Sequence, residues 1–109
     1  MAEGDEAPAD IRAEIIRLFE NDDWRLTARA ETDGKAILLR RRYCQATQWG
    51  ICDYIVGKLR GGFSLTETGM GEPKGSRGIG YVMRNVDGDG LYIKVKIEEG
   101  EVWVLSFHY

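Results

Sequence analysis

The chain has 109 residues, a formal net charge of −3, 43% hydrophobic residues and 30% charged residues. This composition excludes a disordered chain and a fibrous repeat, and the length fits one domain over residues 1–109, with residues 1–9 expected to be flexible. No apolar run approaches the roughly 20 residues that cross a bilayer, and the acidic start lacks the features of an export signal. We therefore expect a cytoplasmic protein that does not contact a membrane.

The cysteine and histidine content argues against a bound metal. Cys44 and Cys52 lie eight positions apart, and the chain has one histidine, so the usual spacings of structural zinc sites are absent. In a reducing compartment both cysteines are expected to be buried thiols, and a redox switch is the alternative. We expect no metal and no cofactor.

Charge is divided unevenly along the chain. Residues 1–34 carry four basic and ten acidic side chains, residues 35–88 carry nine basic and four acidic, and residues 89–109 carry two basic and four acidic. A basic middle segment is therefore flanked by acidic ends. Such a segment either binds phosphates, since binding responds to local potential, or forms a salt-bridged surface exposed to solvent.

The N-terminal half predicts a helix followed by less regular structure. Apolar residues at helical spacing predict a helix over about 9–20, ended by Asn21-Asp22-Asp23. Alternation over 24–31 indicates a short extended stretch, and Asp33-Gly34 is a turn signal. Residues 35–43 fit either a returning hairpin strand or a helix, and the helix is favoured.

The next segments contain a second clear helix and a glycine-rich stretch. Thr47 is a suitable N-cap for a core-facing helix over about 47–60, and Gly61-Gly62 should end it. Residues 69–80 contain five glycines and predict a flexible loop.

The C-terminal third predicts strands over 79–84, 91–97 and 102–108, separated by turns at 87–90 and 98–101. Helices followed by strands indicate the α+β class, with N-terminal helices packed on an antiparallel meander of about three strands.

The last hairpin decides which side chains share a surface. A three-residue loop at 99–101 would place Trp103, Leu105 and Phe107 opposite apolar residues, whereas a two-residue loop would leave them among lysines. Burying three large side chains is worth about 1.5–3 kcal/mol each, so the three-residue loop is predicted. This register places Tyr92 opposite His108, and Lys94 beside them opposite Ser106.

These residues suit RNA cleavage without a metal. The reaction needs one group to accept the 2′-hydroxyl proton, one to protonate the leaving oxygen, and cations around the phosphate. His108, Tyr92 and Lys94 are the candidate catalytic residues, since imidazole exchanges protons near neutrality. The alternative is that they are ordinary exposed residues of a sheet. The candidate phosphate-binding residues are Lys74, Arg77 and Arg84.

Three weaker signals have structural alternatives. The stretch Lys74-Gly-Ser-Arg-Gly-Ile-Gly80 is either a phosphate cradle or a mobile loop, and it lacks P-loop spacing. Asp87-Gly-Asp-Gly90 resembles part of a calcium loop, but without the later glutamate it is read as a hairpin turn. The run Arg40-Arg41-Arg42 fits an RNA backbone or acidic partner, or a solvated edge, and the last is favoured.

Two segments resemble a known family. Leu91-Tyr-Ile-Lys-Val-Lys with Val102-Trp-Val-Leu-Ser-Phe-His108 resembles the C-terminal hairpin of the MqsR-like (motility quorum-sensing regulator) toxins, and Cys52-Asp-Tyr-Ile-Val-Gly-Lys-Leu59 is similar to that family's helix before its variable loop. The resemblance implies a RelE-like α+β fold, metal-independent cleavage of messenger RNA, and neutralisation by a cognate antitoxin.

The resemblance also assigns roles to single residues. Tyr92 matches the family's active tyrosine, and His108 falls where the family has lysine or histidine. The family's loop lysine, in a Phe-Tyr-Lys pattern, is replaced here by Phe63-Ser64-Leu65, and its Trp-Gln pair is replaced near Ile79-Gly80-Tyr81. Lys74 or Arg77 is then the candidate substitute for the missing cation.

The leading hypothesis is an endoribonuclease toxin of a bacterial toxin-antitoxin pair, with messenger RNA and an antitoxin as partners. The alternative is a non-catalytic protein-binding module, such as a degenerate relative or an immunity-type protein. A small-ligand domain closed by the glycine loop is a third hypothesis. The oligomeric state is left open.

Overall fold

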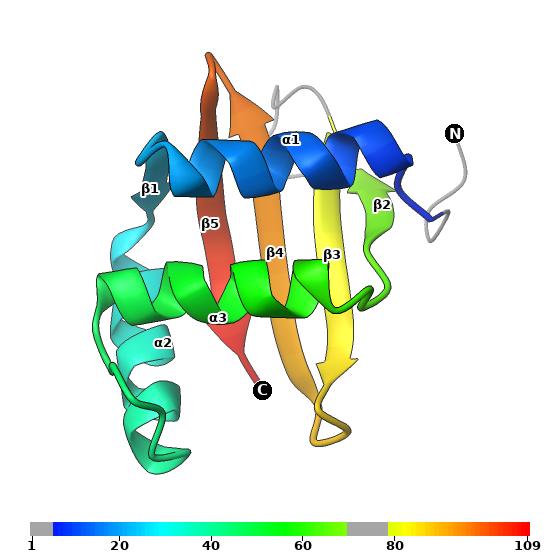
Figure 1. Ribbon diagram of the computed structural model, residues 1–109. Coiled ribbons are helices and arrows are strands. Elements are labelled where there is room, and N and C mark those ends of the chain that lie inside the picture. Colours follow the sequence, from blue (N-terminus) through cyan, green and yellow to red (C-terminus); the bar gives the residue numbers. More distant parts are fainter. Residues whose placement is uncertain (1–5, 70–78) are drawn as a thin grey trace.

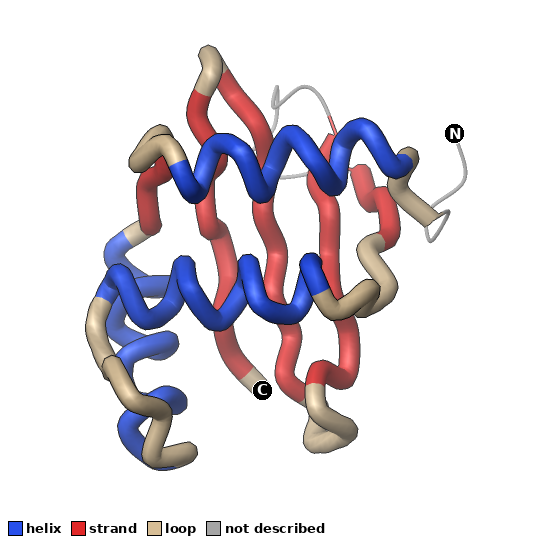
Figure 2. The backbone as a smooth tube through the Cα atoms, viewed as in Figure 1, coloured by secondary structure: helices blue, strands red, loops and turns tan. Residues whose placement is uncertain are grey.

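The computed structural model describes residues 6–69 and 79–109, and it has the predicted α+β class. The described residues form three helices and one five-stranded mixed sheet (Figures 1 and 2). The elements are α1 (Ala9–Glu20), β1 (Trp24–Leu26), α2 (Ala28–Arg40), α3 (Gln48–Arg60), β2 (Thr66–Gly69), β3 (Ile79–Val86), β4 (Leu91–Glu98) and β5 (Glu101–His108).

The sheet has the strand order β1-β5-β4-β3-β2. The predicted meander is its centre, because β3, β4 and β5 pair antiparallel in chain order. Sequence reasoning missed two features of the edges: β2 pairs antiparallel with β3, and β1 pairs parallel with β5. The parallel pairing of β1 is what makes the sheet mixed.

Helices α1 and α3 cover one face of the sheet (Figure 1). Figure 1 shows α1 and α3 running across the strands on that face, with α2 beside the β1 and β5 edge. The core lies between these layers, and its fully buried large side chains include Ile15 of α1, Ile55 of α3 and Phe107 of β5. No helix among the described residues has the length and hydrophobicity that crossing a membrane requires.

Two helices follow their sequence signals closely. The helix predicted over about 9–20 is α1, and the helix predicted over about 47–60 is α3. The Thr47 side chain caps α3 by accepting a hydrogen bond from the Gly50 amide at 3.1 Å, as its N-cap position predicts. The helix favoured over 35–43 is confirmed as far as Arg40.

The extended stretch predicted over 24–31 is confirmed only for β1 (Trp24–Leu26), and the turn predicted at Asp33-Gly34 is wrong, because α2 begins at Ala28. Thr27 is the N-cap, and its hydroxyl accepts a hydrogen bond from the Ala30 amide at 3.1 Å. Gly34 is buried within α2, and a Cβ there would come within 2.7 Å of Ile51 Cδ1. This glycine therefore allows α2 to pack closely on α3, and it does not mark a turn.

The predicted three-residue loop of the last hairpin is also wrong. Glu98 pairs with Glu101, which leaves Glu99-Gly100 as a two-residue loop with positive φ at both positions, 51° and 77°. The register then shifts by one residue at a β-bulge, where Leu105 has no partner strand residue. Beyond the bulge Tyr92 is opposite His108, as predicted.

The bulge changes which large side chains are buried. Of the three expected inside, Phe107 is buried, Trp103 is half-exposed on the opposite face, and Leu105 is half-buried. Val102 and Val104 take the inward positions before the bulge. The hairpin thus combines the favoured tight turn with burial of Phe107.

The segment before α1 is held against the strand β2 region. Ala7 is buried and donates its amide to the Leu65 carbonyl at 2.7 Å, and Glu6 forms an isolated bridge with Thr66. Arg12 also bonds the Leu59 and Phe63 carbonyls at 2.9 and 2.7 Å, which fixes α1 to the end of α3.

Candidate functional site

The side chains that the sequence predicts to be catalytic lie on the sheet face away from α1 and α3. Met83, Ile93 and Phe107 are buried in the core beneath the helices, and side chains alternate along a strand. Their neighbours Arg84, Tyr92 and His108 therefore point to the opposite face, which we call the open face. These three residues, one each from β3, β4 and β5, form what we call the open-face row.

The members of the open-face row contact one another. Tyr92 is directly opposite His108, with ring centroids 5.4 Å apart and ring planes 31° from parallel. The Arg84 guanidinium lies 5.4 Å from the centroid of the Tyr92 ring, within the range of a cation–π interaction. His108 is exposed and Tyr92 is half-buried, so a proton-exchanging group and a phenol share one accessible surface.

Lys94 lies beside this row. It is half-buried on β4, opposite Ser106 of β5 and Val82 of β3. Within the part of the chain that the structure describes, neither Lys94 nor Arg84 has a carboxylate partner. Two cations that have no carboxylate partner among the described residues therefore flank Tyr92 and His108.

Closer to the loop of the last hairpin, the open face carries a paired lysine and a tryptophan. Lys96 pairs with Glu98 at 3.0 Å, and its ammonium lies 5.8 Å from the centroid of the Trp103 ring. Trp103, which the predicted register had placed in the core, is thus a half-exposed aromatic ring next to the Lys96 cation. Aromatic and basic side chains together are typical of surfaces that bind single-stranded nucleic acid.

Helix α2 contributes residues that sequence reasoning did not assign to this site. His108 lines two shallow hollows between α2 and β5, of about 210 and 250 Å³. Asp33 lines both of them, while Arg40 lines the first and Arg29 the second. The sequence indicates these residues only if Asp33-Gly34 is taken as part of a helix. Arg29, Asp33 and Arg40 then share one side of α2.

Two predicted phosphate-binding residues, Lys74 and Arg77, lie outside the described residues, as does most of the glycine-rich loop. Of that loop, the structure describes Gly69 at the end of β2 and the two residues that begin β3. The predicted roles of Lys74 and Arg77 stay predictions.

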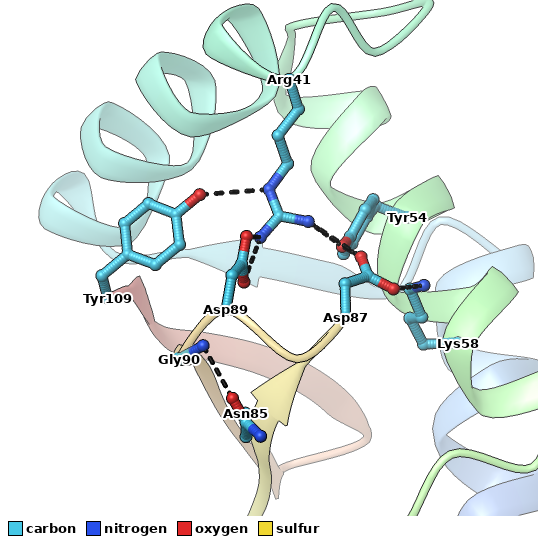
Figure 3. Close-up of polar contacts among 8 residues, drawn as sticks. All are labelled: Arg41, Tyr54, Lys58, Asn85, Asp87, Asp89, Gly90 and Tyr109. Carbon is cyan, nitrogen blue, oxygen red and sulfur yellow. Dashed lines mark hydrogen bonds and ion pairs between the residues drawn. The ribbon is translucent and has the colours of Figure 1, made fainter.

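The arginine run and the Asp87–Gly90 turn meet in a second charged cluster. Figure 3 shows Arg41, from the end of α2, pointing between Asp87 and Asp89 of the β3–β4 turn. Its guanidinium bonds Asp87 Oδ2 at 2.8 Å and Asp89 Oδ1 at 2.6 Å, and Lys58 of α3 binds the other Asp87 oxygen. We call Arg41, Lys58, Asp87 and Asp89, with Tyr54 and Tyr109, the ion-pair network.

The ion-pair network ties the turn to two helices. The Arg41 side chain is only 18% exposed, which corrects its assignment to a solvated edge. Hydrogen bonds from Lys58 and Tyr54 lower the pKa of Asp87 below its usual 3.8, whereas burial and the bond to Asp87 raise the pKa of Tyr54. The two carboxylates are therefore matched by cations, and the segment is the predicted hairpin turn.

The two cysteines differ in their exposure to solvent. Cys52 is buried in α3, and burial raises the pKa of its thiol to about 12. Cys44 is exposed, so the expectation that both thiols are buried is wrong for Cys44, which lies in the connection between α2 and α3. No group of three His, Cys, Asp or Glu side chains among the described residues is placed to hold a metal ion.

Comparison with known proteins adds no relative: no family model, no curated protein and no solved structure matches the chain. The functional proposal therefore depends on the geometry of the open face.

Proposed function

We propose that the protein is a metal-independent endoribonuclease that binds single-stranded messenger RNA on the open face and cleaves it at the open-face row. The observation that supports this most directly is the contact of His108 and Tyr92 between two cations that have no carboxylate partner among the described residues. A cation without a counter-charge attracts phosphates more strongly than the paired cations of the ion-pair network, whose charge the carboxylates largely balance.

The proposed reaction uses the RNA's own 2′-hydroxyl as the nucleophile. His108 accepts the 2′-hydroxyl proton while the 2′-oxygen bonds to phosphorus, and the bond from phosphorus to the 5′-oxygen breaks. Tyr92 gives its phenolic proton to that 5′-oxygen. The products are a 2′,3′-cyclic phosphate and a 5′-hydroxyl, and water returns the proton from His108 to Tyr92.

The cations act on the phosphate. Lys94 and Arg84 flank the two proton-transfer groups, where they would stabilise the negative charge that grows on the non-bridging oxygens. An arginine can bind two such oxygens at once, while a lysine acts as a point charge. The half-exposed ring of Trp103 offers a stacking surface for a neighbouring base.

The proposal extends to the cellular context. As part of this proposal, unrestrained cleavage of messenger RNA by the protein arrests growth, and a cognate antitoxin neutralises it, as in a toxin-antitoxin pair. A RelE-like arrangement of the MqsR type and a cytoplasmic location belong to the same proposal. The three helices on a sheet with a central antiparallel meander are compatible with it.

The direct test is cleavage of a 5′-labelled single-stranded oligoribonucleotide by the purified protein in the presence of EDTA. His108→Ala should lower the rate roughly 100- to 10,000-fold, and Tyr92→Phe should lower it while leaving RNA affinity unchanged. A 2′-deoxy nucleotide at the cleavage position should abolish cleavage by the unaltered protein. Tyr43→Phe is the matched control, because the Tyr43 hydroxyl donates to Asp53 of α3.

Growth of cells gives a second test. Inducible expression should arrest growth, and His108→Ala should relieve the arrest. RNA binding without cleavage would contradict the catalytic part of the proposal. If the protein neither binds nor cleaves RNA and expression is harmless, the non-catalytic protein-binding module replaces the nuclease.

A further inference from the structure

A hollow on the helical side of the molecule contains two tryptophans and three carboxylates. It lies between the end of α1 and the first half of α3, with a volume of about 220 Å³. We call it the tryptophan hollow. Its apolar lining comes from Phe19, Trp24, Trp49, Cys52 and Val56, and its carboxylates are Glu20, Asp22 and Asp53.

The two tryptophan rings form a corner. Their centroids are 6.4 Å apart and their planes are 87° from parallel, so Trp24 and Trp49 present differently oriented surfaces. The Trp49 side chain is 55% exposed although it stands at the start of a core-facing helix. Exposed tryptophans at a concave surface are typical of binding sites, because the ring contributes a large contact area and attracts cations to its face.

The charges around the hollow are negative and incompletely matched. Glu20 pairs with Arg60, and Asp53 accepts a hydrogen bond from the Tyr43 hydroxyl at 2.6 Å. Asp22 has no cationic partner within residues 6–69 and 79–109. None of the residues that line the hollow is basic, so its potential favours a positively charged occupant.

We propose that the tryptophan hollow binds the arginine or lysine side chain of a basic segment of a partner protein. The aliphatic part of such a side chain can pack against the rings, while its charged end reaches Asp22 and Asp53. The volume is below the 300–1,000 Å³ typical of small-molecule pockets, which fits one inserted side chain. A nucleic acid would be repelled by the same carboxylates.

This surface is separate from the proposed nuclease site. The residues of the tryptophan hollow come from α1, α3 and the segment between α1 and α2, on the helical side of the sheet, whereas the open-face row is on the opposite side. Binding of the basic segment therefore does not depend on RNA cleavage, and the inference stands whether or not the protein is a nuclease.

The test uses two synthetic peptides and the three tryptophan indole N–H signals in a proton–nitrogen NMR spectrum. The probe is acetyl-Leu-Arg-Leu-Arg-Leu-amide, and its neutral control carries citrulline in place of each arginine. The arginine peptide should shift the signals of Trp24 and Trp49 in a saturable manner and shift that of Trp103 less, because Trp103 does not line the tryptophan hollow, although it shares a neighbouring hollow with Trp24. The citrulline peptide should bind at least roughly fivefold more weakly.

Variants show whether the arginine peptide binds in the tryptophan hollow. Asp22→Asn keeps a residue that tolerates the positive φ of 62° at this position and removes the charge, so the affinity for the arginine peptide should fall roughly fivefold. Trp49→Ala should lower it more than tenfold. Leu39→Ala is the matched control, since Leu39 is 71% exposed and does not line the hollow.

Three outcomes would overturn the inference. Equal binding of the arginine and citrulline peptides would show that charge plays no part. An unchanged affinity in both Asp22→Asn and Trp49→Ala would place the peptide elsewhere. Sedimentation that shows self-association, lost in Trp49→Ala, would assign the hollow to a second copy of the chain instead.

Discussion

The ion-pair network and the open-face row use similar residue types in opposite ways. In the network, Arg41 and Lys58 face two carboxylates, and the result is a turn fixed to two helices. In the row, Arg84 rests on a tyrosine ring, and it has no carboxylate partner among the described residues. A cation whose charge is already balanced contributes to the fold, whereas one without a counter-charge can bind a ligand.

The largest expected difference between the ion-pair network and the open-face row is in their contribution to stability. Arg41→Met should lower the free energy of unfolding by about 2 kcal/mol, because it removes the ion pair of Asp89 and leaves Asp87 with Lys58 alone. Arg84→Met should change it by no more than about 0.5 kcal/mol, since Arg84 is exposed. Urea unfolding followed by circular dichroism measures both.

Equal losses in the two arginine variants would contradict the distinction between the network and the row. The Arg41→Met variant should still cleave RNA at temperatures where it is folded, because Arg41 is not part of the open-face row. Loss of cleavage in the folded Arg41→Met variant would instead connect the network to the site.

A smaller effect is expected when acid protonates Asp87 and weakens the ion-pair network. The pKa of Asp87 is lowered in the folded protein by the bonds from Lys58 and Tyr54, so the unfolded state takes up this proton at a higher pH than the folded state. The stabilisation is therefore fully present above the usual carboxyl pKa of 3.8 and is lost as the pH falls through the lower folded value.

Asp87→Asn removes this titration. At neutral pH the variant should be less stable by about 1 kcal/mol, since Asp87 is partly exposed. The difference from the unaltered protein should shrink as the pH approaches about 2. Urea unfolding over a pH series measures the difference, and a gap that stays constant with pH would contradict the role assigned to the carboxylate.

The smallest expected effect concerns the salt dependence of RNA affinity. Lys94→Gln should weaken binding of an uncleavable 2′-deoxy oligonucleotide and reduce the slope of log affinity against log salt by about 0.7, the value for one phosphate contact to a single strand. Lys58→Gln is the matched control and should leave the slope unchanged, because its ammonium is bound to Asp87. Equal slopes in the two variants would remove Lys94 from the RNA-binding surface.

Sequence patterns predicted the parts of the fold that local chemistry decides. Helices α1 and α3 have apolar residues at helical spacing, and Thr47 caps the second, so both were located to within a residue or two. The start of α2 was missed because Asp33-Gly34 is a strong local turn signal. Contact with Ile51 overrides it, and that contact exists only after α2 packs on α3.

The candidate site was predicted in part, and for a reason that was only half correct. Burial of large side chains favoured the register that places Tyr92 opposite His108, and the structure has this pair. The loop used to reach that register was wrong, because the β-bulge at Leu105 supplies the shift instead. A bulge has no reliable local signal, so the outward position of Trp103 could not be derived from alternation alone.

The sequence by itself determined the alternation of β4, the α+β class and the residues able to transfer protons. These follow from spacing and side-chain chemistry, which are local properties. The tertiary structure decided which charges have partners, because Arg41 and Asp87 are 46 positions apart in the chain and meet only when α2, α3 and the turn between β3 and β4 pack together. It also decided that Arg84 lies against Tyr92, since the pairing of β3 with β4 brings both side chains to one face.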